Sequence, residues 1–203
     1  MDWNRIPDEA TIQKTMEGLK KRNFNPLIVD DRTAALAKLK ELIPPGADIM
    51  EGASTTLEEI GFIAYLMSGQ QPWQNWKDRI FAEKDREKQA KLRRESTMAG
   101  YFLGSVQAIT EDGIVLGVDA TGSRQGGYVF SAAHVIWVSG VNKLVVDVDA
   151  AFRRVNEHCF PLEDARQKKT GNPAGTVIGK TVLYENEAPG RITTILIREK
   201  LGF

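Results

Sequence analysis

The first third of the chain alternates between short apolar runs and longer stretches in which apolar residues recur every three to four positions. The recurrent spacing predicts an N-terminal helical segment within residues 1–23 and two further helices that end near Ile43 and Met67. The short runs, at 24–29 and 47–50, predict buried strands. Strands that alternate with helices are typical of parallel βαβ units, so we expect an α/β fold with a mostly parallel sheet.

Strand patterns dominate the second half of the chain. Residues 104–109 and 114–118 flank Asp112-Gly113, and an Asp-Gly pair is typical of a tight hairpin turn because glycine adopts positive φ without strain. The other expected elements are a strand at His134–Val138, a helix that begins after Asp147 or Asp149 and ends at Pro161, and closing strands at Thr181–Tyr184 and Arg191–Ile197. Ala188-Pro189-Gly190 predicts a turn between the closing strands, which makes them a second hairpin.

Charges of both signs are interleaved between Lys77 and Glu95. This pattern is typical of a solvated helix face, and we prefer that interpretation to a nucleic-acid contact. The overall balance agrees, because 27 lysines and arginines match 27 aspartates and glutamates. A generally basic surface is absent, so we expect no nucleic-acid partner.

The composition is that of a globular protein with one domain over residues 1–203, since 42% of the residues are apolar and 27% are charged. Cys159 is the single cysteine, which excludes an internal disulfide and a cysteine-cluster metal site. Only His134 and His158 could add imidazole ligands. We therefore expect neither a metal centre nor a cofactor. The N-terminus has no basic leader with an apolar core, and no run is long enough to span a bilayer, so the expectation is a cytoplasmic protein with no membrane partner.

The first candidate site is the segment Glu51–Thr56, which leads from a strand into a helix. Free N–H groups at a helix start favour an anion, and hydroxyl groups add donors, so Gly52, Ser54 and Thr55 are candidate ligand-binding residues. The alternative is helix capping alone, in a capping box that pairs Thr56 with Glu59 or Thr55 with Glu58.

The second candidate is the segment Val118–Arg124, another strand end that enters a turn. Asp119 could accept a proton or a hydroxyl group, and Arg124 could bind a phosphate or carboxylate with two hydrogen bonds, next to Gly122. An Asx turn with an Arg–Asp ion pair explains the same residues equally well.

The third candidate is Gly140–Lys143, which follows the His134–Ser139 strand. Asn142 tolerates left-handed torsions and Lys143 could neutralise an anion, with Gly140 beside them; a plain loop explains the segment nearly as well. The loops that follow parallel strands gather at one edge of a sheet, where open α/β sheets bind ligands.

Several segments, in this order and over nearly the whole chain, resemble the LUD-domain (lactate-utilisation, LutC-like) family. They are Leu39–Gly46, Gly52–Gly61, Tyr101–Gly113 (which adds Gly104 to the candidate ligand-binding residues), Val118–Arg124, Gly140–Val145 and Pro189–Thr193. The resemblance implies a three-layer α/β/α fold like that of sugar-phosphate isomerases, glucosamine-phosphate deaminases and CoA transferases. It also implies a role near lactate oxidation, beside iron–sulfur subunits. Similar members often carry several cysteines before the last strands, whereas residues 165–173 contain none here, so a metal or redox role of such cysteines is not expected.

Two hypotheses follow for the function. The first is a protein, catalytic or not, that binds a small anionic ligand such as a sugar phosphate, a hydroxy acid or a CoA-type molecule, with Asp119 as the best candidate for proton transfer. The alternative is a non-catalytic subunit or regulator of an iron–sulfur lactate-oxidising complex. The sequence also allows a homo-oligomer.

Overall fold

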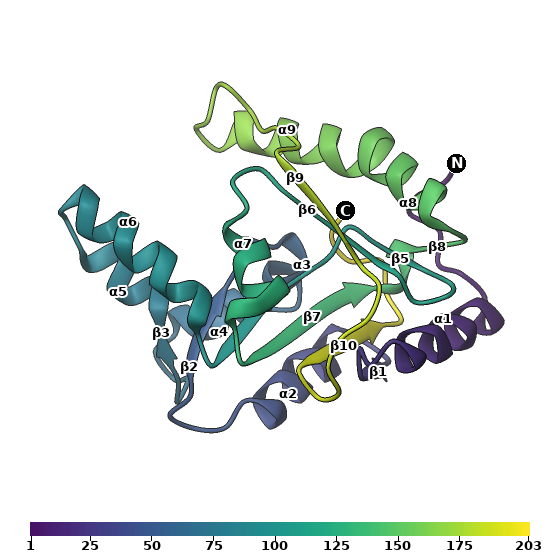
Figure 1. Cartoon of the computed structure of the whole chain (residues 1–203), viewed down its shortest axis with the longest axis horizontal. Helices are drawn as coiled ribbons and strands as arrows, with labels where there is room; N and C mark the ends of the chain where they lie inside the picture. Colours follow the sequence, from purple (N-terminus) through teal and green to yellow (C-terminus); the bar gives the residue numbers. More distant parts are fainter.

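The computed structural model describes all 203 residues and contains two sheets (Figure 1). Sheet A is parallel throughout, in the spatial order β1 (Pro26–Val29), β10 (Ile192–Ile197), β7 (His134–Gly140), β4 (Tyr101–Gly104), β2 (Asp48–Glu51) and β3 (Gln74–Asn75). Sheet B is smaller, in the order β8 (Leu144–Val145), β5 (Ala108–Thr110), β6 (Val115–Asp119) and β9 (Lys180–Tyr184). The predicted α/β fold with a mostly parallel sheet is confirmed.

The interior strand β7 is buried on both faces, because its side chains alternate between two apolar cores. Val135 and Trp137 point into the core on one side of sheet A, and Ile136 and Val138 point into the core on the other side. Continuous apolar runs of this kind are what a parallel strand covered on both faces requires.

Three helices cover one face of sheet A: α2 (Arg32–Leu42), α3 (Thr55–Glu59) and α4 (Phe62–Met67). These helices contact the sheet through the apolar side chains of Leu39, Leu57 and Phe62, which are all fully buried. Asp31 caps α2 by accepting a hydrogen bond from the Ala34 N–H at 2.8 Å, and the helix starts at the next residue, Arg32.

The opposite face is covered by α1 (Glu9–Lys21), by the π-helical segment η2 (Gly127–Ser131) and by sheet B. Leu19, Tyr128 and Tyr184 bring these three units into one core around Trp137. Sheet A therefore lies between two covering layers, as the three-layer architecture predicts.

A long helical unit covers the outer face of sheet B. It consists of α8 (Val148–Arg154), the π-helical segment η4 (Val155–Cys159) and α9 (Phe160–Lys169). Ala150, Ala151 and Val155 pack against Leu116 and Val118 of β6. Over sheet B the protein is thus one layer thicker than the resemblance implies.

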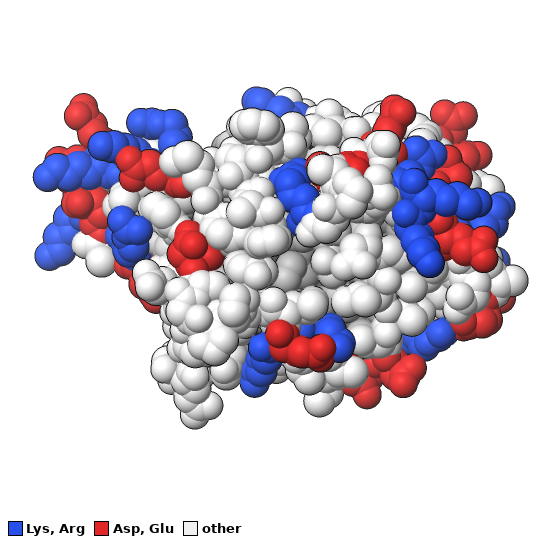
Figure 2. Space-filling view, turned by 60° about the horizontal axis from the view of Figure 1, so that its bottom comes forward, with Lys and Arg blue, Asp and Glu red and all other residues white.

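The charged stretch forms α5 (Trp76–Ala82) and α6 (Arg86–Glu95), which project from one end of the molecule (Figure 1). No residue of α6 is buried. Figure 2 shows charged side chains of both signs gathered at this end and at the opposite end, with a largely uncharged surface between them. The remaining short elements are η1 (Ser96–Met98), α7 (Ser123–Gly126) and η3 (Val141–Lys143).

The closing strands do not form the hairpin that the sequence predicted. β9 pairs with β6 in sheet B, and β10 enters sheet A between β1 and β7. The reason is burial: β10 places Leu196 and Ile197 in different cores and needs a partner strand on each side. The strand expected at 104–109 is also divided between the sheets, since β4 belongs to sheet A and β5 to sheet B. The predicted hairpin at Asp112-Gly113 is confirmed, because β5 and β6 pair antiparallel on either side of it.

Two helix predictions were also wrong in their limits. The helix expected up to Met67 is broken at Gly61, which has a φ of 78°, and Met67 is exposed because Phe62 and Leu66 make the contacts instead. The helix expected to end at Pro161 continues to Lys169, since Pro161 directly follows the π-helical turn η4 and the backbone stays helical through it. No helix of the protein has the length and apolar character needed to cross a membrane.

Helix α1 touches the β5–β6 turn through two glycines. A Cβ atom at Gly18 would lie 2.6 Å from the Gly113 nitrogen and 2.4 Å from the Asp112 carbonyl carbon. We expect Gly18→Ala to lower the free energy of unfolding by about 1–3 kcal/mol, because backbone atoms on both sides leave no room for a methyl group. Gly126→Ala is the control: its Cβ would meet only ordinary contacts, and a helical backbone favours alanine. Urea titration of both variants checks this, and equal losses would contradict it.

Candidate functional site

A pocket of about 510 Å³ opens where β2, β4 and β7 of sheet A and β6 of sheet B reach their carboxyl ends. Its wall combines the segments that follow these strands with parts of α5, α6, η4 and α9. The chemically most relevant lining residues are Glu51, Ser54, Thr55, Thr56, Lys77, Arg93, Ser105, Gln107, Asp119, Arg124, Lys143, Cys159, Glu163, Arg166 and Gly202. The location is the one at which parallel α/β sheets bind ligands.

Lys143 is the most unusual group in this pocket. It lies in η3 directly after β7, and only 2% of its surface is exposed. Its Nζ donates hydrogen bonds to the Ser105 Oγ at 2.9 Å and to the Thr56 Oγ1 at 3.1 Å, and no carboxylate lies within ion-pair distance. Burial and the nearby positive charge of Arg154 lower the pKa of Lys143 to about 7.

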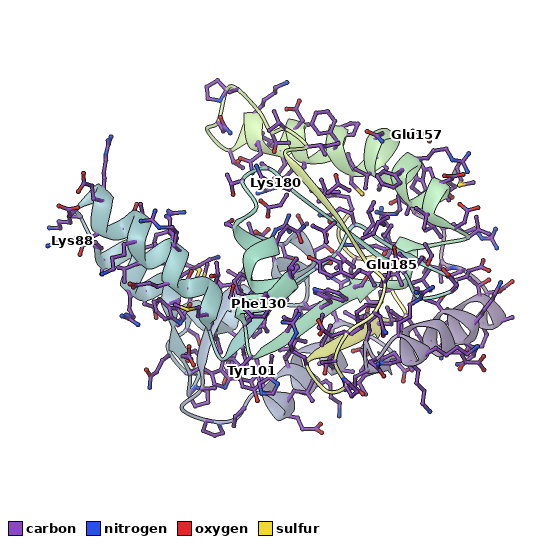
Figure 3. All side chains as sticks on the ribbon, in the orientation of Figure 1. Lys88, Tyr101, Phe130, Glu157, Lys180 and Glu185 are labelled. Atoms are coloured by element: carbon purple, nitrogen blue, oxygen red, sulfur yellow. The ribbon has the colours of Figure 1, made fainter.

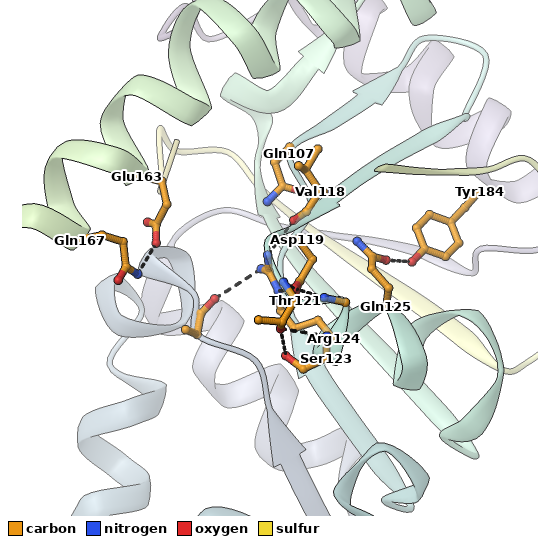
Figure 4. Close-up of polar contacts among 12 residues, drawn as sticks. Gln107, Val118, Asp119, Thr121, Ser123, Arg124, Gln125, Glu163, Gln167 and Tyr184 are labelled. Atoms are coloured by element: carbon orange, nitrogen blue, oxygen red, sulfur yellow. Dashed lines mark hydrogen bonds and ion pairs between the residues drawn. The ribbon is translucent and has the colours of Figure 1, made fainter. Parts of the chain in front are cut away.

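Asp119 and Arg124 form a closed turn at the end of β6 (Figure 4). One carboxylate oxygen of Asp119 accepts from the backbone N–H groups of Thr121 at 2.9 Å and Gly122 at 2.6 Å, and the other accepts from the Arg124 Nε at 2.8 Å. Burial would raise the pKa of Asp119, but the hydrogen bond and charge of Arg124 and the two backbone N–H groups hold it below its usual value. An ionised carboxylate with both oxygens occupied is a poor proton acceptor for a ligand.

Arg124 is equally occupied. Its Nη2 donates to the Val118 carbonyl oxygen at 2.8 Å, and its Nη1 lies 3.4 Å from the Ala53 carbonyl oxygen. Gly52 makes room for this side chain, since a Cβ atom there would lie 2.3 Å from the Arg124 Cδ. The geometry is that of the Asx turn with an ion pair, and Arg124 joins the segment after β2 to the segment after β6.

A second buried pair lies at the end of β2. Glu51 is 2% exposed, and its Oε1 lies 2.7 Å from the Lys77 Nζ, whereas its Oε2 has no hydrogen-bond partner. Burial raises the pKa of this carboxyl group, although Lys77 opposes the effect. A buried carboxyl group with one unpartnered oxygen is a better candidate for proton transfer than Asp119.

The π-helical segment η4 brings Arg154 and Cys159 together. The Arg154 Nη1 lies 2.8 Å from the Cys159 Sγ and 2.5 Å from the Gln107 carbonyl oxygen, while Nε and Nη2 have no partner. Arg154 is fully buried, and no carboxylate neutralises it. Burial raises the pKa of Cys159, so the thiol is protonated and the local charge stays positive.

The charges of the lining side chains are unequal. Three acidic residues face five basic ones, and each acid is paired: Glu51 with Lys77, Asp119 with Arg124 and Glu163 with Arg166. Lys143 and Arg93 remain without an acidic partner. The pocket therefore carries more positive than negative side-chain charge in a chain whose formal net charge is zero.

The structure brings six of the predicted site residues to this pocket: Gly52, Ser54, Thr55, Asp119, Arg124 and Lys143. Ser54 also caps α3, by accepting a hydrogen bond from the Leu57 N–H at 3.3 Å, so capping and pocket lining coincide at this residue. Neither expected capping box forms, because Ser54 is the N-cap instead of Thr55 or Thr56, and the Lys143 Nζ donates to the Thr56 hydroxyl group.

Four predicted residues lie outside the lining. Gly104 makes room for the Tyr128 hydroxyl group, which would lie 1.8 Å from a Cβ atom, and Gly122 supplies a turn with a φ of 91°. Gly140 passes directly beneath the C-terminal segment, and Asn142 binds that segment by accepting from the Leu201 N–H at 3.1 Å. These four residues shape the surroundings of the site.

Sequence reasoning placed Glu51 and Thr56 in the first candidate segment but assigned neither to ligand binding, and it gave no role to Ser105 or Arg154. Ser105 and Glu51 could have been found from their positions, because each stands at the carboxyl end of a parallel strand. Arg154 gave no signal, since one arginine on a helix is ordinarily exposed.

The architecture and the pocket define an α/β domain with a ligand-sized cavity at the carboxyl edge of a parallel sheet. The model of the LUD domain matches residues 12–198. The chain belongs to the LUD-domain family.

A search of curated proteins finds no match. Among solved structures, the chain is similar to a DUF162 family protein from Deinococcus radiodurans, with 11% identity, a TM-score of 0.57, and 95% of this chain and 99% of that chain covered. It is also similar to eIF2B delta from Chaetomium thermophilum, with 11% identity, a TM-score of 0.39, and 72% and 57% covered. At such identities the first likeness supports the fold alone, and the second carries no argument.

We expect Lys143→Met to stabilise the protein in a pH-dependent way. The folded pKa of about 7 lies below the value of 10.5 of an unperturbed lysine, so the unfolded chain binds more protons between these values. The cost of burying Lys143 is therefore largest below pH 7 and falls as the pH rises to about 10. The variant should gain on the order of 2–4 kcal/mol at pH 6 and little near pH 10. Thermal unfolding across this range checks it, and a gain independent of pH would contradict the burial of an unpaired ammonium group.

Proposed function

We propose that this LUD domain binds a small molecule that carries an anionic group, a carboxylate or a phosphate, in the pocket between sheets A and B. The observation that carries the proposal is Lys143, a buried cation that faces the pocket and is surrounded by hydroxyl groups instead of a carboxylate. Burying a charge without a counter-ion is unfavourable, and an anionic ligand would supply the missing charge.

The rest of the wall supports the same conclusion. The three internal ion pairs leave Lys143 deep in the pocket and Arg93 at its exposed rim without acidic partners. A cavity lined by excess positive charge attracts anions and raises their local concentration. The volume of about 510 Å³ is that of a typical small-molecule site.

The apolar part of the wall bears on the kind of ligand. Phe81, Val177 and Ile178 line the pocket although each is exposed, whereas Ser105, Thr56 and Lys143 form its polar part. A hydroxy acid or sugar phosphate would occupy the polar part, and a CoA-type ligand would also cover the apolar side chains. All three belong to the proposed class.

The test is a thermal-shift series with L-lactate, D-glucose 6-phosphate and acetyl-CoA, each compared with an uncharged analogue where one exists, lactamide or D-glucose. A ligand at a hundred times its Kd stabilises the native state by about 2.7 kcal/mol, which raises the Tm of a protein of this size by about 5–10 °C. We expect at least one anion to act in this way and the uncharged analogues to have no effect.

Variants assign the effect to the pocket. Lys143→Met and Arg93→Ala should each reduce the shift, because each removes a cation that no acid neutralises. Lys88→Met is the matched control, since Lys88 points away from the body of the protein at the end of α6 (Figure 3). The proposal fails if no anion raises the Tm, or if Lys88→Met weakens the shift as much as the pocket variants. Arg124→Ala is unsuitable, because it leaves Asp119 buried without its partner.

A further inference from the structure

The surroundings of the Lys143 amine suit a nucleophile as well as a cation. The Nζ atom lies among three groups that line the same pocket: the Ser105 hydroxyl group at 2.9 Å, the Thr56 hydroxyl group at 3.1 Å and the backbone of Gly202. Gly202 lets the Lys143 Nζ and the Thr56 Oγ1 lie close to the backbone, since a Cβ atom there would lie 3.0 Å from Nζ and 2.4 Å from the Thr56 Oγ1. Lys143, Thr56 and Ser105 all line the pocket, so a small ligand bound there lies beside the amine and both hydroxyl groups.

The charged and titratable groups around Lys143 disfavour the ammonium form. Burial has the largest effect, and Arg154 and Arg124 add positive charge, whereas Cys159 and Glu59 act in the opposite direction. The resulting pKa of about 7 leaves a large fraction of Lys143 neutral at physiological pH. Lysines desolvated beside another cation are the ones that form imines with carbonyl compounds.

We propose that Lys143 forms a covalent imine with a ligand that carries a carbonyl group next to an anionic group, such as a small 2-oxo acid. The proposal rests on the proposed function, because the same pocket must first bind the anionic group. Arg93 also lines this pocket without an acidic partner, so its positive charge still attracts the anionic group once Lys143 has reacted.

The reaction is balanced without a further reagent. The lone pair of the Lys143 Nζ attacks the carbonyl carbon, so that a C–N bond forms and the C=O π bond breaks, and one N–H proton passes to the oxygen to give a neutral carbinolamine. The second N–H proton then passes to the hydroxyl group, the C–O bond breaks, water leaves and a neutral C=N bond remains. Thr56 and Ser105 lie close enough to Nζ to hydrogen-bond the oxygen while it gains its protons.

Trapping with borohydride tests the imine on the intact protein. The protein is incubated with glyoxylate and sodium cyanoborohydride, and the modified lysines are located by peptide mass spectrometry. We expect Lys143 to be modified at least roughly tenfold faster than exposed Lys88 at pH 7.5, because a far larger fraction of a lysine with a depressed pKa is neutral there. Adducts confined to exposed lysines, or equal rates at Lys143 and Lys88, would overturn the proposal.

Two variants separate chemistry from folding. Lys143→Arg keeps the positive charge but cannot form an imine, so the adduct at this position should disappear. Arg154→Met removes the cation that disfavours the ammonium form, so the pH profile of trapping at Lys143 should move to higher pH, an effect that a purely structural role of Arg154 would not produce. An unchanged pH profile of trapping counts against the proposal. If Lys143→Arg does not fold, the positions of the adducts on the wild-type protein decide between the two outcomes.

Matched probes distinguish the two proposals. Glycolate carries the carboxylate without the carbonyl group, and acetaldehyde carries the carbonyl group without the carboxylate. If glyoxylate and glycolate raise the Tm equally and no adduct forms, anion binding stands and the imine is wrong. If acetaldehyde is trapped at Lys143 as fast as glyoxylate and glycolate leaves the Tm unchanged, the imine stands and anion recognition is wrong.

Discussion

Burial of β7 on both faces is the constraint on which the other parts of the protein depend. The strand pairs with β10 and β4, and Val135 to Gly140 are all buried. One core joins it to sheet B and the other to α2–α4, so a shift of one residue would exchange the two sets of side chains. The register of β7 also fixes Lys143, which follows three residues after the strand ends.

The sequence predicted the parts of this fold that depend on local patterns. The parallel sheet, the N-terminal helix and the Asp112-Gly113 hairpin were correct, because apolar periodicity and glycine torsions act over a few residues. The pairing of β9 with β6 was not predictable in this way. It depends on Tyr184 packing against Trp137 with ring centroids 4.9 Å apart, a contact between residues far apart in sequence.

The candidate site shows the same division. Strand ends pointed to the segments that contain Ser54, Asp119 and Lys143, and the structure places all three at one pocket. Their relative importance was not visible in the sequence. Asp119 and Arg124 form an internal turn, whereas Lys143 has no acidic neighbour, and this difference arises from which side chains the tertiary structure leaves unpaired.

The charged side chains of the pocket fall into two groups, those that are paired within the wall and those that have no acidic partner. Three acids and three bases neutralise one another within the wall and hold its segments in place, as Arg124 does for the segments after β2 and β6. The cations without an acidic partner form no ion pair that would hold wall segments together. Lys143 and Arg154 are buried at a cost to the stability of the fold. Groups kept in spite of such a cost are commonly those that function requires.

The π-helical segment η4 has a consequence for how this protein can vary. Each residue of an α-helix advances the chain by about 100° around the axis, and a π-turn inserts one additional residue. Deleting a residue between Val155 and Cys159 would restore a regular helix and keep its hydrogen bonds. Because the wider π-turn takes up the additional residue within about one turn, the deletion would leave α9 facing sheet B at nearly the same angle, and Glu163 and Arg166 would stay in the pocket wall. The helical unit over sheet B can therefore lose one residue at η4, next to the cavity, without changing the face that α9 presents to the pocket.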